Sequence, residues 1–268
     1  MEEVKVEHKE EVLALDKALT LMERVRKECP WDRSQTNDTL RTLTIEEMYE
    51  LSQAILDKKD DEICKELGDV LMHIIFYALI GKEKNKFTII DVANSLSEKL
   101  IRRHPHVFGG DNKISSEEVE KNWERIKLKE GNRSTFSGVP ETLPSLIKAY
   151  RLQDKAKGIG FDWKDEKGVR DKIQEEIEEL EEELKQPNNN EKITEEFGDV
   201  LFSLINYARF IDVNPDTALE KTNRKFKRRF EYMENKATEQ GTPLYQLNID
   251  QMEELWQQAK KEEKQSKQ

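Results

Sequence analysis

Apolar residues recur three or four positions apart along most of this chain, and charged residues fill the positions between them. Val12, Leu15, Leu19 and Met22 are typical of the pattern. This spacing places apolar side chains on one face of an α-helix. No segment alternates between apolar and polar residues for long, as a half-buried strand would. We therefore predict an all-α protein with almost no strand.

Breaks in the pattern predict where the helices begin and end. Pro30 ends the first helix, because proline disfavours helix in the residue before it. Thr44 and Glu47 predict a capping box at the start of the second helix, and Gly81 predicts a cap at the end of the third. The predicted helices cover about residues 12–28, 43–58, 61–80, 89–103, 117–129, 146–157, 169–185, 191–210, 215–241 and 249–264.

The second half of the chain repeats the first. Residues 66–80 and 196–210 share eight identities in 15 positions, and residues 99–103 are echoed by 225–229. Residues 131–144 are rich in Gly, Pro, Ser and Asn, as linkers are. We predict a duplicated helical unit, with domains at residues 1–130 and 145–268 and a linker at 131–144. A glycine in mid-helix, Gly68 or Gly198, precedes an aspartate in each copy and predicts close approach of another backbone.

Each copy also carries two pairs of carboxylates. Residues 46–50 read Glu-Glu-Met-Tyr-Glu and residues 66–69 read Glu-Leu-Gly-Asp, and residues 175–179 and 196–199 repeat this arrangement. Side chains three apart on a helix share a face. Two such helices facing each other would gather four carboxylates, and each pair about 5 Å apart would repel by roughly 3 kcal/mol at an effective dielectric of 20. A divalent cation would reverse this penalty, and oxygen ligands suit Mg²⁺ or Mn²⁺. The alternative is a set of ordinary solvated helix faces.

Several cations recur near the acidic segments. Lys225 and Arg229 are four apart, as are Lys99 and Arg103, and each pair suits either a phosphate-binding fork or an ordinary charged surface. Lys192 precedes Glu196 by four residues, whereas the first copy has Glu62 at the matching position.

Composition narrows the class of protein. The formal net charge of −11 argues against general binding to nucleic acid or to a membrane surface. Two widely separated cysteines, Cys29 and Cys64, and the lack of a signal peptide or of an apolar span favour a cytoplasmic protein.

The order E-E-x-x-E, a gap, then E-x-x-D resembles the motif of the MazG family of all-α nucleoside triphosphate pyrophosphohydrolases. The resemblance extends from Cys29-Pro30-Trp31-Asp32 through 102–108 and 160–163 to Trp256. It implies two tandem MazG-like helical bundles and Mg²⁺-dependent hydrolysis of nucleoside triphosphates to the monophosphate and pyrophosphate. It also implies broad base tolerance, homodimers, and a nucleotide-pool housecleaning or alarmone-linked role.

The resemblance also assigns residues. It gives the second unit the main activity, with Glu175, Glu176, Glu179 and Lys192 as catalytic candidates and the general base left open. The metal ligands it implies are Glu176, Glu179, Glu196 and Asp199, and in the first unit Glu47, Glu50, Glu66 and Asp69. The implied nucleotide contacts are Lys192, Lys225, Arg229 and Trp256, and in the first unit Lys99, Arg103 and Trp123.

Two other functions stay open at this point. The carboxylates would serve equally well in a nucleotide-binding regulatory scaffold without turnover. A single-substrate relative, resembling a dUTPase or a phosphoribosyl-ATP pyrophosphohydrolase, would carry the same metal site.

Overall fold

The computed structural model describes residues 8–109, 115, 118, 119, 122, 123, 126 and 134–265, which form helices and turns without strands. The chain divides into two compact units, Met1–Lys113 and Ile114–Gln268. None of the described helices is both long enough and apolar enough to cross a membrane.

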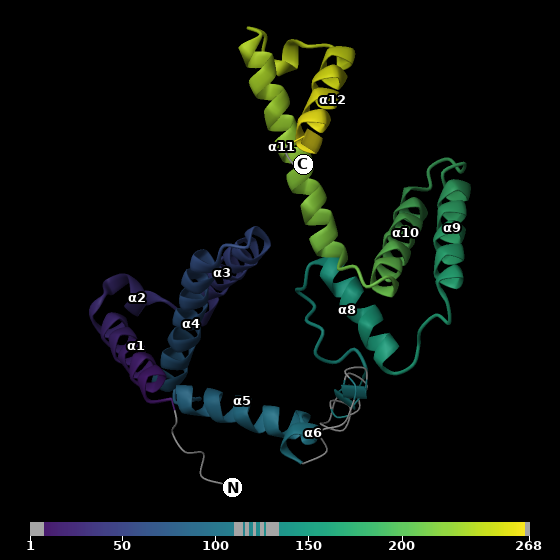
Figure 1. The fold of residues 1–268 in the computed structure, drawn as a ribbon. Helices are drawn as coiled ribbons and strands as arrows, with labels where there is room; N and C mark the ends of the chain where they lie inside the picture. The colour runs from purple at the N-terminus through teal and green to yellow at the C-terminus, as the bar shows by residue number, and fades with distance from the viewer. Residues whose placement is uncertain are drawn as a thin grey trace. The chain divides into compact units, whose positions relative to one another are not determined.

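The first unit is built around a helical hairpin. Its helices are α1 (Lys9–Glu28), α2 (Pro30–Ser34), α3 (Asn37–Asp57), α4 (Asp60–Glu83), α5 (Ile89–Arg103) and α6 (Pro105–Phe108). Helices α3 and α4 pack against each other, and α1 packs on α4 (Figure 1). Lys58 adopts the left-handed conformation with φ 56° and ends α3, so the chain turns back directly into α4. The hairpin buries Leu40, Phe76 and Ile80 as one apolar cluster.

An arginine ties the tryptophan-bearing turn of the first unit to the hairpin. Arg26 of α1 donates to both carboxylate oxygens of Glu83, at 2.8 Å each. Its third nitrogen, Nη1, donates to the carbonyl oxygens of Asp32 and Gln35. These contacts fix the turn that follows α1 and carries Trp31.

The second unit contains α8 (Ser145–Gly158), α9 (Glu166–Glu183), α10 (Asn190–Phe210), α11 (Pro215–Glu239), the short 3₁₀ helix η1 (Leu244–Gln246) and α12 (Ile249–Gln265). Helices α9 and α10 lie side by side, α8 packs on α10, and α11 pairs with α12 (Figure 1). Met233, Ala237, Leu244 and Leu255 form the buried apolar cluster between α11 and α12.

The start of α3 corrects the predicted second helix. The helix begins seven residues before Thr44, and its capping box is formed by Thr36 and Thr39. Thr44 therefore lies inside the helix, where its hydroxyl donates to the carbonyl of Leu40 at 2.9 Å. The sequence contains two possible threonine caps, at Thr36 and at Thr44. The helix begins at the earlier one, because Leu40 then lies within the helix and packs in the core.

The predicted cap at Gly81 was wrong as well. Helix α4 continues past Gly81 to Glu83, and Gly81 is buried against the ring of Phe87, where a Cβ would lie 2.7 Å from the ring. At Gly68 and Gly198 an added Cβ would meet no described heavy atom of the same chain within 4 Å, so the close approach of another backbone at these glycines stays a prediction. The short helices α2 and α6 were not predicted. Most of the helix predicted at 117–129 falls outside the described residues.

Candidate metal centres

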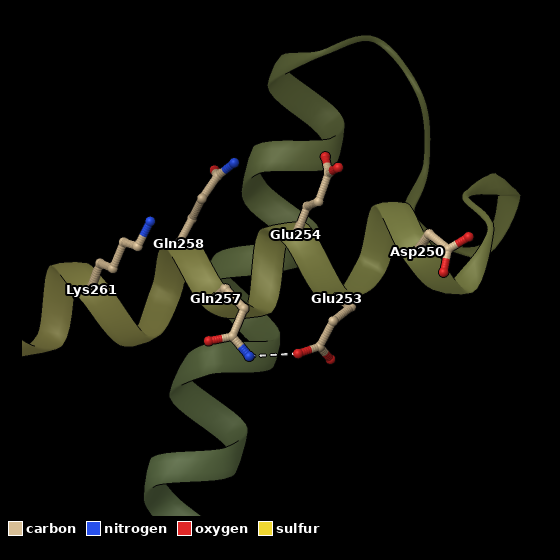
Figure 2. A pocket seen from close by; sticks show the side chains of 6 residues that line it. All are labelled: Asp250, Glu253, Glu254, Gln257, Gln258 and Lys261. Carbon is tan, nitrogen blue, oxygen red and sulfur yellow. Dashed lines mark hydrogen bonds between the residues drawn. The ribbon is translucent and has the colours of Figure 1, made fainter.

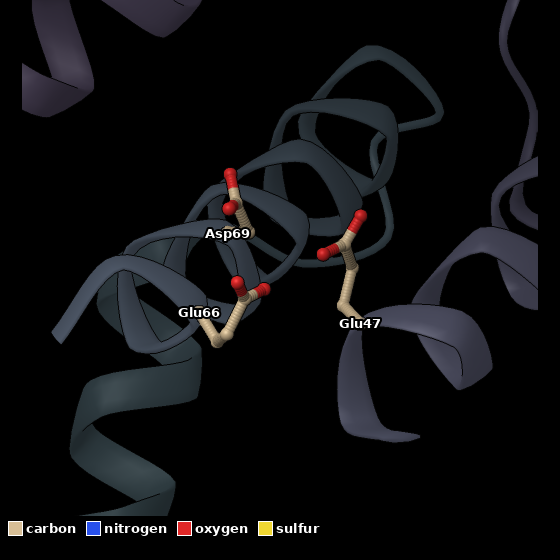
Figure 3. A group of neighbouring side chains, drawn as sticks. All are labelled: Glu47, Glu66 and Asp69. Carbon is tan, nitrogen blue, oxygen red and sulfur yellow. The ribbon is translucent and has the colours of Figure 1, made fainter. Parts of the chain in front are cut away.

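The first unit brings three carboxylates together. Glu66 and Asp69 lie three apart on α4, and Glu47 faces them from α3. One oxygen from each lies within 4.8 Å of the others. Figure 3 shows the three carboxyl groups pointing into the same space between the two helices. The helical spacing of the sequence is therefore enough to create an oxygen-lined site.

Burial makes this group costly without a cation. Glu66 is only 5% exposed, and its Oε2 is buried with no hydrogen-bond partner among the described residues. Burial raises the pKa of Glu47, and the charges of Asp69, Glu50 and Glu66 raise it further. Lys65 is the nearby cation, with its Nζ 3.9 Å from Glu66 Oε1. A buried carboxylate oxygen without a donor is the feature that a bound cation would explain.

A neutral hydrogen-bond network lies beside this group. Thr44 Oγ1 is 2.8 Å from His73 Nδ1 and 2.7 Å from the hydroxyl of Tyr77. His73 Nε2 lies 4.0 Å from Glu47 Oε1. Burial lowers the pKa of His73 and outweighs the opposing charge of Asp69. The sequence analysis missed His73 as a neighbour of the site, although its place four residues after Asp69 on the same helix face was a signal.

The second unit repeats the arrangement of carboxylates. Glu176 of α9 meets Glu196 and Asp199 of α10, and again one oxygen from each lies within 4.8 Å of the others. Glu176 is buried, with 7% of its surface exposed. The two groups thus use matching residues of the sequence repeat.

A lysine occupies the edge of the second group. Lys172 Nζ lies 2.8 Å from Glu176 Oε1 and 2.7 Å from Glu175 Oε1. Hydrogen bonds to Glu175 and then Glu176 raise the pKa of Lys172, so it stays charged. Sequence reasoning missed Lys172, although its position four residues before Glu176 was a signal that it shares the face of the ligand.

Glu50 and Glu179 stand just outside these groups of ligand atoms. Glu50 follows Glu47 by three residues on α3, and Glu179 follows Glu176 by three residues on α9. The charge of Glu50 contributes to the raised pKa of Glu47. Burial raises the pKa of Glu179, and the charge of Glu176 adds to the effect. Three carboxylates per unit therefore converge, and the inclusion of Glu50 and Glu179 as ligands stays a prediction.

The predicted cations of the second unit lie apart from the carboxylates. Lys192 pairs with Glu183 at 3.6 Å. Arg229 donates from Nε and Nη2 to Glu263 Oε2, at 2.9 and 2.7 Å, and its guanidinium lies over the ring of Trp256. None of the described hydrogen bonds or ion pairs joins Lys225 or Arg229 to the second carboxylate group. Glu263, which also accepts from Arg228, was not foreseen from the sequence.

Trp256 packs against the apolar cluster of α11 and α12, where the ring of Phe226 lies 5.4 Å from it. The apolar cluster and the ring of Phe226 both lie against the indole, so core packing explains the position of Trp256 within one chain. Lys99 and Arg103 lie on α5 of the first unit, and Trp123 is partly buried.

Two hollows differ in chemistry. A shallow one of about 460 Å³ runs along α12, and Figure 2 shows its charged and amide side chains spread along this single helix. A larger pocket of about 680 Å³ in the second unit is walled by α8, α9 and α10 and includes Glu176, Asp199 and Lys172 in its lining. Only the second of these two hollows adjoins a carboxylate group.

The donor set fits a hard divalent cation. All three converging side chains in each unit are carboxylates, which Mg²⁺ and Mn²⁺ accept. In the first unit, Oε2 of Glu66 has no hydrogen-bond partner among the described residues, and in the second unit a single lysine faces Glu175 and Glu176 beside two further carboxylates. Each group can therefore hold a cation that in turn attracts phosphate oxygens.

Comparison with known proteins reveals the same duplication. The family model described as MazG nucleotide pyrophosphohydrolase domain matches twice, at residues 35–108 and 165–233. Each matched segment contains one carboxylate group.

Named relatives extend the similarity to nearly the whole chain. The nucleoside triphosphate pyrophosphohydrolase/pyrophosphatase MazG of Thermotoga maritima is 45% identical over 257 residues, covering 94% of this chain and 98% of the relative. The nucleoside triphosphate pyrophosphohydrolase of Escherichia coli strain K12 is 38% identical, covering 93% and 98% respectively. That of Mycolicibacterium smegmatis is 36% identical over 150 residues, covering 54% of this chain and 46% of its own length.

Proposed function

The chain belongs to the MazG nucleotide pyrophosphohydrolase family, and from this premise we propose that it hydrolyses nucleoside triphosphates to the monophosphate and pyrophosphate with the help of Mg²⁺. The observation that carries the proposal is the convergence of Glu176, Glu196 and Asp199 beside a pocket of about 680 Å³. Broad tolerance of the base, and a housecleaning or alarmone-linked role, are part of the same proposal.

The converging carboxylates would hold the cation. These are Glu176, Glu196 and Asp199 in the second unit and Glu47, Glu66 and Asp69 in the first, with Glu179 and Glu50 as further ligands. When bound, Mg²⁺ or Mn²⁺ would neutralise phosphate charge and act as a Lewis acid.

Contacts within α9 narrow the choice of general base. Glu175 and Glu176 both accept from the ammonium group of Lys172. Glu179 lies one turn further along the helix and forms no ion pair among the described residues. The charge of Lys172 lowers its pKa, but burial and the charge of Glu176 raise that pKa by more. We assign one carboxylate oxygen of Glu179 to the cation and the other to the proton of the attacking water. The oxygen of this water forms the new bond to the α-phosphorus while the bond from the α-phosphorus to the bridging oxygen breaks. The bonding electrons then leave with pyrophosphate.

The cations of α11 would act on the phosphates together. The Arg229 guanidinium already gives two donors to Glu263, which leaves Nη1 to reach a phosphate oxygen. Lys225 lies one turn before it and would supply a full ammonium charge. Lys192 would exchange Glu183 for phosphate when substrate binds. Lys99 and Arg103 of the first unit, and Trp123 from the first copy of the sequence repeat, would play the matching parts at the first carboxylate group.

A homodimer would complete the bundle. The α9–α10 hairpin leaves the side chains of Phe197, Leu201 and Leu204 about half exposed. Two-helix hairpins with an apolar outer face form stable four-helix bundles by pairing. A second copy of this chain would cover that face.

A substrate panel tests the proposal. Each ribonucleoside and deoxyribonucleoside triphosphate is incubated with the protein and Mg²⁺, and monophosphate and pyrophosphate are measured together. We expect equal amounts of both products from several bases, and no reaction with the Asp199→Asn variant or with excess chelator. Turnover of a single nucleotide would instead indicate a single-substrate enzyme. Binding without any turnover would indicate a regulatory scaffold and would overturn the proposal.

A further inference from the structure

The pocket of the second unit has an interior that the phosphate chemistry does not use. It extends from Glu176 and Asp199 between α8, α9 and α10 and has a volume of about 680 Å³. Pockets of this size accept small organic ligands. Its position beside the carboxylate group raises the question of which part of a nucleotide it takes, so the inference rests on the proposed function.

Aromatic side chains form much of its wall. Phe136, Phe161, Trp163 and Phe202 line it together with Leu152. Phe161 is 80% exposed, so this ring stands at the open rim. The indole of Trp163 lies against Gly168, where an added Cβ would be 2.9 Å from the ring. Flat apolar walls of this kind suit the faces of an aromatic ring system.

Away from Lys172 and Glu176, the described residues of this lining contain one further ion pair, between Arg209 and Asp162. Arg209 donates to both carboxylate oxygens of Asp162 and, through Nη2, to Asn206 Oδ1 at 2.9 Å. Arg209 is 7% exposed, and its charge is matched by that of Asp162. The inner pocket is therefore electrically balanced and offers no attraction for phosphate, which the carboxylate end with its cation would take instead.

One buried acceptor in the lining lacks a donor. Gln153 of α8 is 7% exposed and donates from Nε2 to the carbonyl oxygen of Phe202 at 2.8 Å. Its Oε1 is buried and has no hydrogen-bond partner among the described residues. The orientation of the amide follows from chemistry, because a carbonyl oxygen requires the NH₂ group opposite it. A buried acceptor without a donor is costly unless a ligand supplies one.

We propose that this pocket binds the nucleobase of the substrate, and that Gln153 Oε1 accepts a hydrogen bond from an N–H group of the base. Adenine, cytosine, guanine, uracil and thymine each carry at least one such N–H. One acceptor between aromatic walls would thus tolerate all of them and reject a base that has none. Gln153 acts here as a specificity-determining residue.

Purine ribonucleoside triphosphate is the sharpest probe, because it is ATP without the 6-amino group and its base has no N–H donor. We compare kcat/KM for the two nucleotides in the unaltered protein. Leaving the acceptor unpaired should reduce kcat/KM for the purine nucleotide about tenfold or more. The dissociation constants of the two corresponding monophosphates, measured by calorimetry, should differ in the same direction.

Substitution of the acceptor completes a double-mutant cycle. Gln153→Met keeps the length of the side chain and removes Oε1, so the preference for ATP should fall to within about twofold. Gln53→Met is the matched control, because Gln53 is an exposed glutamine of the first unit whose Nε2 also donates to a protein oxygen, Asp57 Oδ2, at 2.8 Å. It should keep the preference of the unaltered protein.

The outcomes separate this inference from the proposed function. Hydrolysis of both nucleotides with equal kcat/KM would overturn the nucleobase pocket and leave the proposed function standing. An unchanged preference in a folded Gln153→Met variant would overturn the role of Gln153. If that variant fails to fold, the comparison of nucleotides in the unaltered protein still decides the proposal. Absence of hydrolysis with any triphosphate would overturn the proposed function instead.

Discussion

The two carboxylate groups share their ligands and differ in what surrounds them. Leu43 lies four residues before Glu47 in the first unit, and the matching position, four residues before Glu176 in the second unit, is Lys172. Four residues after the aspartate, the first has His73 and the second has Ser203. The duplication therefore kept the geometry that places three oxygens within 4.8 Å of one another, and the surroundings diverged.

This difference changes how each group tolerates its negative charge. In the second unit, Lys172 offsets the charge of Glu175 and Glu176 directly. In the first unit the closest cation, Lys65, stays 3.9 Å from Glu66 Oε1, a neutral hydrogen-bonded network lies beside the group, and burial raises the pKa of Glu47. The comparison teaches that a matching ligand set does not make two equivalent sites.

Removing ligands from each group in turn should give the largest effect. Glu176→Ala and Asp199→Ala should reduce pyrophosphate release by about a thousandfold or more, roughly 4 kcal/mol of transition-state stabilisation. Glu47→Ala and Asp69→Ala should reduce it far less, because Lys172 and the pocket adjoin only the second group. Initial rates with several triphosphates measure both. Equal losses in the two units would break the comparison and indicate two equivalent catalytic sites.

Arg26 holds the turn that carries Trp31, and Arg209 binds Asp162, the residue before Trp163, so these two arginines provide the next contrast. Arg209 is buried in the second unit with Asp162, whereas Arg26 of the first unit pairs with Glu83, which is half exposed. Arg209→Met leaves the carboxylate of Asp162 without its cation and should lower the free energy of unfolding by about 3 kcal/mol. Chemical denaturation followed by circular dichroism measures the change. The double variant with Asp162→Asn should recover part of the loss, and no recovery would show that packing of the arginine stem is responsible.

Exchanging the neighbouring residues should produce a smaller effect on metal affinity. Lys172 competes with a divalent cation for Glu176, so Lys172→Leu should tighten Mn²⁺ binding at the second group about fivefold, or roughly 1 kcal/mol. Leu43→Lys should weaken binding at the first group by a similar factor. The Mn²⁺ affinity of each variant is measured by calorimetry. The carboxylate group of the other unit is disabled in these proteins by Glu→Gln and Asp→Asn changes, so that only one group binds the metal. Weaker binding in the Lys172→Leu variant would mean that the lysine orients Glu176 for the metal.

The sequence predicted the features that depend on local spacing. Helix α5 has the bounds that were predicted, 89–103, since Thr88 caps it and His104-Pro105 interrupts it. The three converging carboxylates of each unit also followed from helical periodicity. The family resemblance is confirmed by the two matches of the family model.

Features that depend on tertiary contacts were missed. The true start of α3 required knowledge that Leu40 is buried, because two possible caps were present. The pocket lined by Gln153, Phe202 and Arg209 joins helices that are distant in sequence. The pairing of Arg229 with Glu263 joins α11 to α12, although the repeat contained a signal for it, since Glu130 follows Trp123 at the spacing by which Glu263 follows Trp256.

The smallest expected effect concerns the charge of Glu83 in the first unit. Hydrogen bonds from Arg26 lower the pKa of Glu83 below its ordinary value, more than burial raises it. A lowered pKa in the folded protein means that the pair stabilises the fold above the unfolded carboxyl pKa of about 4.3 and loses this contribution as the pH falls through the folded value.

Glu83→Gln should therefore lower the free energy of unfolding by about 1 kcal/mol at pH 7, a figure reduced for solvent screening because half of the carboxylate is exposed. The difference from the unaltered protein should shrink steadily as the pH falls below about 4, since both then carry a neutral group at this position. Glu23→Gln is the matched control, because Glu23 pairs with Lys82 at 2.8 Å with both side chains more than half exposed, and its effect should be near zero at every pH. A difference for Glu83→Gln that stays constant between pH 7 and pH 3 would show that the hydrogen-bond geometry around Arg26, and not the charge, holds the turn of the first unit in place.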